Sequence, residues 1–329
     1  MNLTVIAAGA WGTALAVAFS AKHRVTLWTR EEDVAQIMRD QRENTRFLPG
    51  HRLPDALLIG DDFNAAVADA ELLVIATPLA GLRPTVRQLR DCAQVKPLIW
   101  VCKGIEADTA KLPHQIVAEE LGAQALCGAL SGPSFAEEVA RGLPTAVTLA
   151  ANQTDFGHRT ALALHSHHLR IYANDDLPGV EIGGAVKNVM AIATGICDGL
   201  GLGLNARAAL ITRGLSEIAR LGAALGAKPQ TFMGLAGMGD LILTCTGDLS
   251  RNRRVGLALA AGKHLPQILA ELGHVAEGVS TARAVASLAT QLGIEMPITQ
   301  AVDAILHRNE PAASAVEKLL NRDPKIETV

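Results

Sequence analysis

The sequence has few aromatic residues, little net charge and no closely spaced cysteines, and each lack excludes a class of protein. Aromatic residues make up only 3% of the 329 residues, too few for platforms that stack on bases. A net charge of -3 provides no basic field for nucleic acid or an anionic membrane. No C-x-x-C spacing is present, which argues for reduced thiols and against zinc, among the cysteines Cys92, Cys102, Cys127, Cys197 and Cys245. We therefore expect no nucleic-acid partner and no metal.

Long apolar runs are also scarce. Residues 3–21 are largely apolar and end in Ala-Phe-Ser-Ala, which resembles the cleavage site of a secretory signal peptide. However, Met1 and Asn2 precede this run without any Lys or Arg, and glycines break it at turn spacing. No other stretch approaches the roughly 20 uninterrupted apolar residues of a membrane span. We therefore expect a cytoplasmic protein, without stable membrane insertion, whose 49% hydrophobic residues fill two cores.

The start of the chain has the pattern of a dinucleotide-binding turn. A β-branched run at residues 3–6 leads into Gly9 and Gly12, and an alanine-rich helical segment follows. This order suits a pyrophosphate, because the backbone can approach closely and free helical N–H groups point at the anion. The full fingerprint is G-x-G-x-x-G, and Ala7 replaces its first glycine. If the turn needs a positive φ, the Ala7 side chain crowds it, which would affect cofactor affinity.

The first half of the chain alternates strands with helices. Strands are predicted at residues 25–28, 72–76, 97–102, 125–130 and 145–150, and a charged helix at 31–42. Continuous apolar strands separated by helices predict a parallel sheet covered on both faces. Ligands of such sheets lie outside the carboxyl ends of the strands. We therefore expect Thr77, Lys103 and residues 131–134 to face one crevice.

Strand signals almost vanish from residue 181 onward. Residues 206–226 carry an apolar stripe at helical spacing. The predicted fold class is therefore α/β, with an N-terminal Rossmann-type doubly wound sheet at 1–178 and an all-α C-terminal domain at 179–329. The sequence leaves the oligomeric state open, and a homodimer is compatible with it.

Arg30 bears on the choice of dinucleotide. NAD-preferring sites place Asp or Glu at the end of the second strand, where this chain has Trp28, Thr29 and Arg30. A guanidinium offers a planar fork to a 2′-phosphate. We therefore predict a preference for NADPH, with NADH use left open by the adjacent Glu31. The alternative is that Arg30 is a solvated surface residue.

A lysine lies inside an apolar helical stretch in the second half. Lys187 and Asn188 follow Gly-Gly-Ala-Val at residues 183–186. Burial would lower the pKa of the lysine toward neutrality, where an amine can exchange protons. The alternative is a lysine that reaches solvent at a helix end.

Two further segments add polar groups to the second half. Asp240 lies in a glycine-rich bend and could orient Lys187, with Thr244 on the same face if the stretch is helical; the alternative for Asp240 is a helix N-cap. Residues 250–254, Ser-Arg-Asn-Arg-Arg, combine a hydroxyl, an amide and three guanidinium groups. This composition favours a phosphate site, and a solvated loop is the alternative.

Taken together, these motifs resemble those of bacterial NAD(P)-dependent glycerol-3-phosphate dehydrogenases. The similarity runs in order from about residue 3 to about residue 300, and the clear departure is Ala7. It rests on GAWGTALA at 9–16, LSGPSFA at 130–136, GAVKN at 184–188, NARAALITRG at 205–214, GDL at 239–241 and SRNR at 250–253.

The resemblance implies an enzyme that interconverts dihydroxyacetone phosphate and sn-glycerol 3-phosphate, supplying the latter for phospholipid synthesis. Lys187 would donate and accept the proton at C2, supported by Asp240 and Lys103. The substrate-binding residues it implies are Lys103, Gly132, Ser134, Lys187, Asn188, Asp240, Thr244, Ser250, Arg251 and Asn252. The cofactor-binding residues are Gly9, Ala10, Trp11, Gly12, Arg30, Lys103, Ala136, Arg251, Val275 and Glu277.

Two alternatives remain at this point. Other two-domain dehydrogenases, acting on β-hydroxy acids or 6-phosphogluconate, also use a Lys-Asn pair on a helix. The arginine-rich residues 250–254 and the run at 205–214 favour the triose phosphate instead. A non-catalytic NADPH sensor is the second alternative, which would not need Lys187, Asp240 and Arg251 together.

Overall fold

The computed structural model describes residues 1–92, 94–273 and 275–323, and the chain divides into two compact units. The sheet unit comprises Met1–Cys102 and Pro113–Leu177, and the helical unit comprises Lys103–Leu112 and Pro178–Val329. Residues 103–112 differ from the expected division, which placed them with the sheet. Ile105 and Leu112 are buried in the core of the helical unit, and this packing accounts for the difference.

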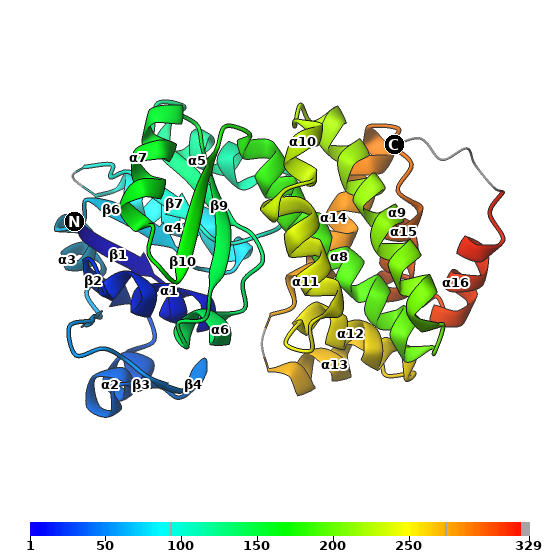
Figure 1. Cartoon of the computed structure of the whole chain (residues 1–329), viewed down its shortest axis with the longest axis horizontal. Helices are drawn as coiled ribbons and strands as arrows, with labels where there is room; N and C mark the ends of the chain where they lie inside the picture. Colours follow the sequence, from blue (N-terminus) through cyan, green and yellow to red (C-terminus); the bar gives the residue numbers. More distant parts are fainter. Residues whose placement is uncertain (93, 274, 324–329) are drawn as a thin grey trace. The chain divides into compact units, whose positions relative to one another are not determined.

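In the described part of the sheet unit, the main sheet has eight strands in the order β10-β9-β8-β7-β6-β1-β2-β5 (Figure 1). The strands are β1 (Asn2–Ile6), β2 (Arg24–Trp28), β5 (Leu58–Gly60), β6 (Leu72–Ile75), β7 (Leu98–Trp100), β8 (Cys127–Ser131), β9 (Thr145–Ala151) and β10 (Leu169–Asn174). From β5 to β8 every neighbouring pair is parallel, which confirms the predicted mostly parallel, Rossmann-like sheet.

The prediction that the strand at 145–150 continues the parallel series is wrong. β9 runs antiparallel to β8, and β10, which the sequence pattern did not reveal, pairs parallel with β9. A parallel connection needs a crossover that returns along the sheet, usually a helix. The helix between β8 and β9 is α6 (Ala136–Ala140), whose five residues are too few to return along the strand.

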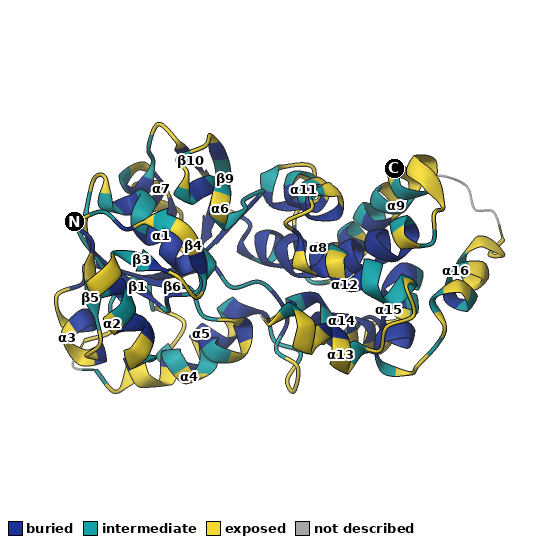
Figure 2. Cartoon of the chain, turned by 90° about the horizontal axis from the view of Figure 1, so that it is seen from below, coloured by how far each residue is buried: buried dark blue, intermediate teal, exposed yellow. Residues whose placement is uncertain are grey.

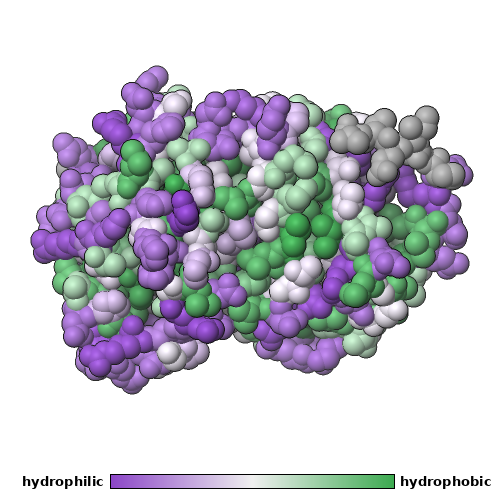
Figure 3. Space-filling model, in the orientation of Figure 1, coloured by the Kyte–Doolittle hydropathy of each residue, from purple (hydrophilic) through white to green (hydrophobic). Residues whose placement is uncertain are grey.

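Helices and a small hairpin complete the sheet unit. They are α1 (Ala10–Ser20), α2 (Glu32–Gln41), α3 (Phe63–Ala68), α4 (Leu79–Arg90), α5 (Pro113–Leu121), α7 (Thr154–Leu164) and the hairpin of β3 (Glu43–Asn44) and β4 (Leu48–Arg52). Val5, Leu27 and Val74, from three neighbouring strands, are fully buried in the core. Polar residues cover much of the face drawn in Figure 3, as expected when apolar side chains are gathered inside.

The helical unit is built around one long buried helix, α8 (Leu177–Gly199), drawn dark blue in Figure 2. The remaining elements are α9 (Gly203–Ala224), α10 (Pro229–Phe232), the π-helix η1 (Leu235–Gly239), α11 (Asp240–Thr246), α12 (Arg251–Ala260), α13 (Leu265–Leu272), α14 (Glu277–Gln291), α15 (Pro297–His307) and α16 (Ala312–Leu320). Every element in the described part of this unit is helical, which confirms the predicted all-α domain.

The sequence was expected to hold no second stretch of about 20 uninterrupted apolar residues, and α8 fits this expectation because Glu181 and Lys187 interrupt it. Its 23 residues are long and apolar enough to cross a membrane, although Lys187 lies among them. The apolar window is entirely buried within the protein, so α8 is a core helix.

The turn after β1 has the backbone conformation in which an alanine is strained. Ala7 has φ 86°, so this turn does use the positive φ that favours glycine. A Cβ on Gly12 would lie 2.1 Å from the carbonyl oxygen of Ala7, so only glycine lets α1 start this close to β1. The chain therefore keeps the fingerprint turn with one unfavourable residue.

Replacing that residue should stabilise the protein. Ala7→Gly removes a strained Cβ, which stabilises the folded state. Glycine also gives the unfolded chain more conformational freedom, which offsets part of this gain. We therefore expect the free energy of unfolding to rise by a net value of about 0.5–1 kcal/mol. Urea denaturation followed by circular dichroism measures the change. The neighbouring Ala8, which is buried and has no positive φ, provides the control. Ala8→Gly should destabilise by about 1 kcal/mol, and equal effects of the two changes would contradict this account.

Candidate active site

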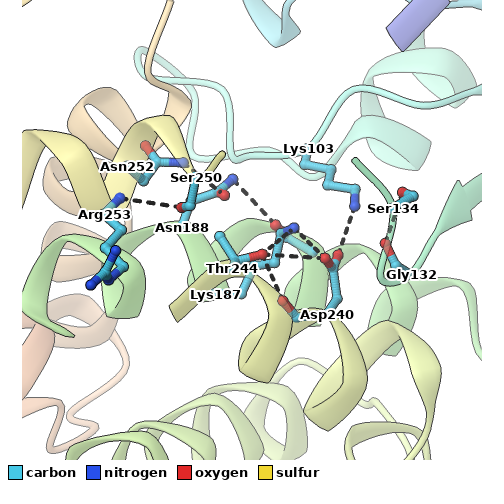
Figure 4. A network of polar contacts seen from close by, with 11 residues as sticks. Lys103, Gly132, Ser134, Lys187, Asn188, Asp240, Thr244, Ser250, Asn252 and Arg253 are labelled. Carbon is cyan, nitrogen blue, oxygen red and sulfur yellow. Dashed lines mark hydrogen bonds and ion pairs between the residues drawn. The ribbon is translucent and has the colours of Figure 1, made fainter. Parts of the chain in front are cut away.

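Lys187 lies in the middle of α8 with its side chain buried (Figure 4). Its Nζ donates to Oδ1 of Asp240 and, at 2.9 Å, to Oγ1 of Thr244. The lysine therefore does not reach solvent at a helix end, which was the alternative interpretation of this position.

Asp240 receives a second ammonium group. The Nζ of Lys103 donates to its other oxygen, Oδ2, at 2.6 Å. Asp240 is only 1% exposed, and Thr244 Oγ1 donates to the main-chain oxygen of Asp240 at 2.6 Å. Thr244 lies one turn along α11, so the predicted shared helical face is confirmed. One buried carboxylate thus binds two lysines, all within the helical unit.

These surroundings bring the Lys187 amine close to neutrality. Burial disfavours the charged ammonium and lowers the pKa of Lys187 from 10.5 to about 7. The carboxylate of Asp240 opposes this shift, while the positive charge of Lys103 adds to it. Near pH 7 both protonation states of Lys187 are therefore populated, which is the requirement for a group that both gives and takes a proton.

The π-helix η1 and a glycine on α8 place Asp240 beside Lys187. η1 ends at Gly239, directly before Asp240, whereas the sequence indicated only a glycine-rich bend. On α8, Gly183 lies one turn before Lys187, and a Cβ there would come within 2.5 Å of the Ala236 carbonyl oxygen. The two backbones therefore touch. π-Helical turns are frequent at functional sites.

Asp240 does not have the alternative role of an N-cap. It is the first residue of α11, after Gly239 at the N-cap position, and its carboxylate is bound to the two lysines. The side chain is thus held by charge pairing, not by the helix backbone.

A second buried cluster joins three helices. Asn252 Nδ2 donates to Asn188 Oδ1 at 2.9 Å, and the N–H of Gly278 donates to Asn252 Oδ1 at 3.0 Å. These residues come from α12, α8 and α14 respectively. Ser250 Oγ accepts from the N–H of Arg253 at 3.2 Å and caps α12. The predicted substrate residues Asn188, Ser250 and Asn252 thus lie around the start of α12.

The three guanidinium groups of residues 250–254 do not act as one cluster. Arg253 is bound by Asp198, with Nη2–Oδ2 at 2.8 Å, and by Asp248, with Nη1–Oδ1 at 2.9 Å. Its role is therefore structural. Arg251 is exposed at the first position of α12 and interacts electrostatically with Glu277, the first residue of α14. Val275, also predicted to contact the cofactor, is exposed just before α14.

The predicted sites in the sheet unit lie at the carboxyl ends of strands. Gly9 lies at the N-cap position of α1 after β1, and Ala10, Trp11 and Gly12 form the first turn of that helix. Ala136 begins α6 and packs with Ala10 and Trp11 in one small apolar cluster. The remaining predicted residues of this unit are Arg30 after β2, and Gly132 and Ser134 after β8.

This edge of the sheet fits a dinucleotide. No side chain caps the N-terminus of α1, and open space lies where a Cβ on Gly9 would be. Both features leave the helical N–H groups accessible to an anion. Within residues 1–92 and 94–273, two buried hydroxyls at strand ends, Thr77 Oγ1 and Ser131 Oγ, have no hydrogen-bond partner. Both residues were predicted at strand ends, without an assigned role. A polar ligand that reaches them would supply the hydrogen-bond partners that their hydroxyls lack.

Removing the charge of Asp240 tests the network itself. Asp240→Asn leaves two ammonium groups without their shared counter-charge, and we expect a loss of about 3–5 kcal/mol in unfolding free energy at pH 7. Chemical denaturation measures it. Asp248→Asn is the matched control, because Asp248 is 98% exposed and its ion pair should contribute less than about 1 kcal/mol. Similar losses in the two variants would show that the lysines do not depend on Asp240.

The chain is similar to known proteins along nearly its whole length. The family models for the N-terminus and C-terminus of NAD-dependent glycerol-3-phosphate dehydrogenase match residues 2–157 and 176–317. Glycerol-3-phosphate dehydrogenase [NAD(P)+] of Dechloromonas aromatica is 68% identical over 327 residues, covering 99% of both chains. The protein of that name from Aromatoleum aromaticum is 62% identical, covering 99% of this chain and 100% of its own.

Solved structures agree with this result. The crystal structure of glycerol-3-phosphate dehydrogenase from Coxiella burnetii has a TM-score of 0.94 at 42% identity, covering 98% of this chain and 99% of its own. The corresponding enzyme of Saccharomyces cerevisiae has a TM-score of 0.83 at 31% identity, covering 96% and 98%. With both halves matched in order, the chain belongs to the NAD-dependent glycerol-3-phosphate dehydrogenase family.

Proposed function

We propose that this chain interconverts dihydroxyacetone phosphate and sn-glycerol 3-phosphate with NAD(P)H, and that Lys187 is the proton donor and acceptor. Membership of the family supports the reaction. The single observation that carries the residue assignment is the buried lysine whose pKa lies at about 7, held by Asp240 and Thr244.

The proposed role of Lys187 follows from where charge develops. When bound, the nicotinamide supplies the hydride that reduces the ketone carbon of the substrate. As negative charge builds on the ketone oxygen, the Lys187 ammonium stabilises it and donates its proton. In the reverse direction the neutral amine takes the proton from the C2 hydroxyl. Asp240 holds the Lys187 side chain in one orientation, and Lys103 keeps the pKa of Lys187 low enough for both directions.

The substrate phosphate would be bound at the start of α12. Arg251 is exposed there, and the ten residues of α12 present their N-terminal N–H groups and positive helix end. Asn252 and Ser250 lie in the same turn and fix its geometry. The phosphate is remote from the reacting carbon, and the free energy of binding it is used to hold that carbon in the orientation that the reaction needs. We retain Gly132, Ser134, Asn188 and Thr244 as further substrate-binding residues, as the resemblance implies.

For the cofactor we propose a preference for NADPH. Arg30 is 83% exposed, and its only ion pair among residues 1–92 is with the adjacent Glu31, Nε–Oε1 at 3.1 Å. Exposed ion pairs of this kind contribute little to stability, so the guanidinium of Arg30 can exchange Glu31 for a 2′-phosphate at little cost. The other proposed contacts are Gly9, Ala10, Trp11, Gly12, Lys103, Ala136, Arg251, Val275 and Glu277. Thr77 joins them on the ground of its unpaired hydroxyl.

The cellular setting is also a proposal. Supply of glycerol 3-phosphate for phospholipid synthesis, a cytoplasmic location and a homodimer all stay predictions. The division into a dinucleotide-binding domain at 1–178 and a substrate domain at 179–329 is proposed with one amendment, since residues 103–112 pack with the helical unit. No contact among the described residues favours the alternative of an enzyme that acts on β-hydroxy acids or 6-phosphogluconate.

Substituting Lys187 tests the catalytic proposal. Lys187→Met fills similar apolar space but cannot carry a proton, so kcat with dihydroxyacetone phosphate should fall by at least about 100-fold. NADPH binding, followed by fluorescence titration, should persist. Lys263→Met is the control, because Lys263 is a surface residue paired with Glu271 and should leave kcat unchanged. A Lys187→Met variant that keeps more than about a tenth of kcat would remove Lys187 from this role.

Absence of turnover in the wild type, despite saturable NADPH binding, would favour the alternative of a non-catalytic NADPH sensor.

Substituting Arg30 tests the cofactor preference. Arg30→Ala removes the proposed partner of the 2′-phosphate, so kcat/KM for NADPH should fall by about tenfold to a hundredfold. The value for NADH, which lacks that phosphate, should stay within about twofold. Arg24→Ala, an exposed arginine at the start of β2, provides the control for a general loss of positive charge. Parallel losses with both cofactors would contradict the assignment.

A further inference from the structure

A cavity of about 310 Å³ lies between α14 and α15, in the helical unit. It is lined by Arg283, Ala286, Ser287, Thr290, Asp303, His307 and Arg308. None of these residues belongs to the site described above. The volume is within the range of pockets that hold small molecules.

One residue that lines this cavity, Asp303, has an unsatisfied acceptor. Asp303 is 6% exposed, and its Oδ2 pairs with Nη1 of Arg308 at 2.9 Å. Its Oδ1 is buried and has no hydrogen-bond partner in the described part of the chain. A buried carboxylate oxygen without a hydrogen bond is energetically unfavourable, so a donor from a bound molecule would stabilise it. The cavity therefore fits a ligand that brings a hydroxyl or ammonium group to Asp303.

The rest of the cavity carries positive charge. Arg283 is exposed and has no hydrogen bond or ion pair with any described residue. Arg308 is 62% exposed, and the exposed Ser287 adds a hydroxyl. The lining holds two guanidinium groups and a single carboxylate, which is paired with Arg308, so its net charge favours an anion.

We propose that this cavity binds a small phosphate monoester that also carries a hydroxyl or ammonium group. Arg283 and Arg308 bind the phosphate, and Asp303 Oδ1 accepts a hydrogen bond from the second group. Arg283 is the residue with the most to contribute, because its guanidinium is not engaged elsewhere in the described chain.

One helix connects this cavity to the proposed active site. Glu277 and Gly278 form the first turn of α14, and the N–H of Gly278 is held by Asn252. In the same turn, the carbonyl oxygen of Val279 lies 2.9 Å from Nε2 of His307, a cavity residue. An occupant that contacts His307 therefore acts on the turn that carries Glu277. The cavity is placed to serve as an effector site.

Titration with O-phosphoethanolamine, which carries both a phosphate and an ammonium group, tests the proposal. Isothermal titration calorimetry is done on the full-length Arg251→Gln variant, so that binding at the proposed substrate-phosphate position is suppressed. We expect saturable binding with one site per chain. Adding Arg283→Gln should weaken it by about tenfold or more, whereas adding Lys263→Gln, a surface cation elsewhere, should not. Inorganic phosphate, which lacks the ammonium group, should bind more weakly than the probe.

The outcomes separate this proposal from the catalytic one. Asp303→Asn should reduce the preference for the probe over inorganic phosphate, because the amide is a poorer acceptor for an ammonium group. If the two Arg251→Gln chains, with and without Arg283→Gln, bind the probe equally, or neither binds it, the cavity is not a phosphate-ester site. If binding is lost with Arg251→Gln alone and present in the wild type, the probe occupies the substrate site, which overturns this inference and leaves the proposed function intact.

Discussion

The carboxylate of Asp240, buried between the ammonium groups of Lys187 and Lys103, is the interaction on which the proposed chemistry depends. It draws together three segments that are far apart in the sequence: α8, α11 and residues 103–112. Burial of two positive charges with one negative charge leaves a net positive field, and this field together with desolvation lowers the pKa of Lys187. Together with the burial of Ile105 and Leu112, this interaction holds the segment that starts at Lys103 to the helices, although the segment follows a strand of the sheet.

Close backbone contacts hold the charged groups in register. Gly183 lets the carbonyl oxygen of Ala236 approach α8 one turn before Lys187, and the π-helix then delivers Asp240 to the amine. On the next face, Asn188, Asn252 and Gly278 form a buried chain of hydrogen bonds across α8, α12 and α14. The helices that carry Lys187, the proposed proton-transfer group, and Arg251, the proposed phosphate-binding residue, are therefore linked through side-chain amides. A rigid frame of this kind keeps reacting groups positioned before substrate arrives.

Local sequence pattern predicted what depends on local order. The turn with Gly9 and Gly12, the strands β1, β2, β6, β7 and β8, and the spacing of Asp240 and Thr244 on one helical face follow from periodicity and short-range geometry. The short edge strand β5 was not predicted. The pairing of Asp240 with Lys187 could also be proposed, because a buried lysine needs a counter-charge. By contrast, the reversed direction of β9 depends on how far a short helix can carry the chain, which no pattern within the strand records.

Other features depend on tertiary partners that the sequence does not name. In the sequence, Arg253 and Arg251 are equivalent members of one basic segment. In the structure, Arg253 is bound by Asp198, which lies more than fifty residues away in the chain. The 23-residue length of α8 was not predicted, because Glu181 and Lys187 interrupt its apolar run, and only the surrounding helices make a buried lysine tolerable there. The π-helix has no residue signature beyond its glycines. The cavity between α14 and α15 comes from residues that have no recognisable motif.

The pH dependence of the two reaction directions tests the central claim most directly. With a Lys187 pKa of about 7, reduction of dihydroxyacetone phosphate needs the ammonium form, so its kcat/KM should fall as pH rises through about 7. Oxidation of sn-glycerol 3-phosphate needs the neutral amine and should rise over the same range. Opposite slopes with a common midpoint are the expected result. Profiles that run parallel in the two directions, or that show no transition between about pH 6 and 9, would contradict the assignment of Lys187 as the proton-transfer group.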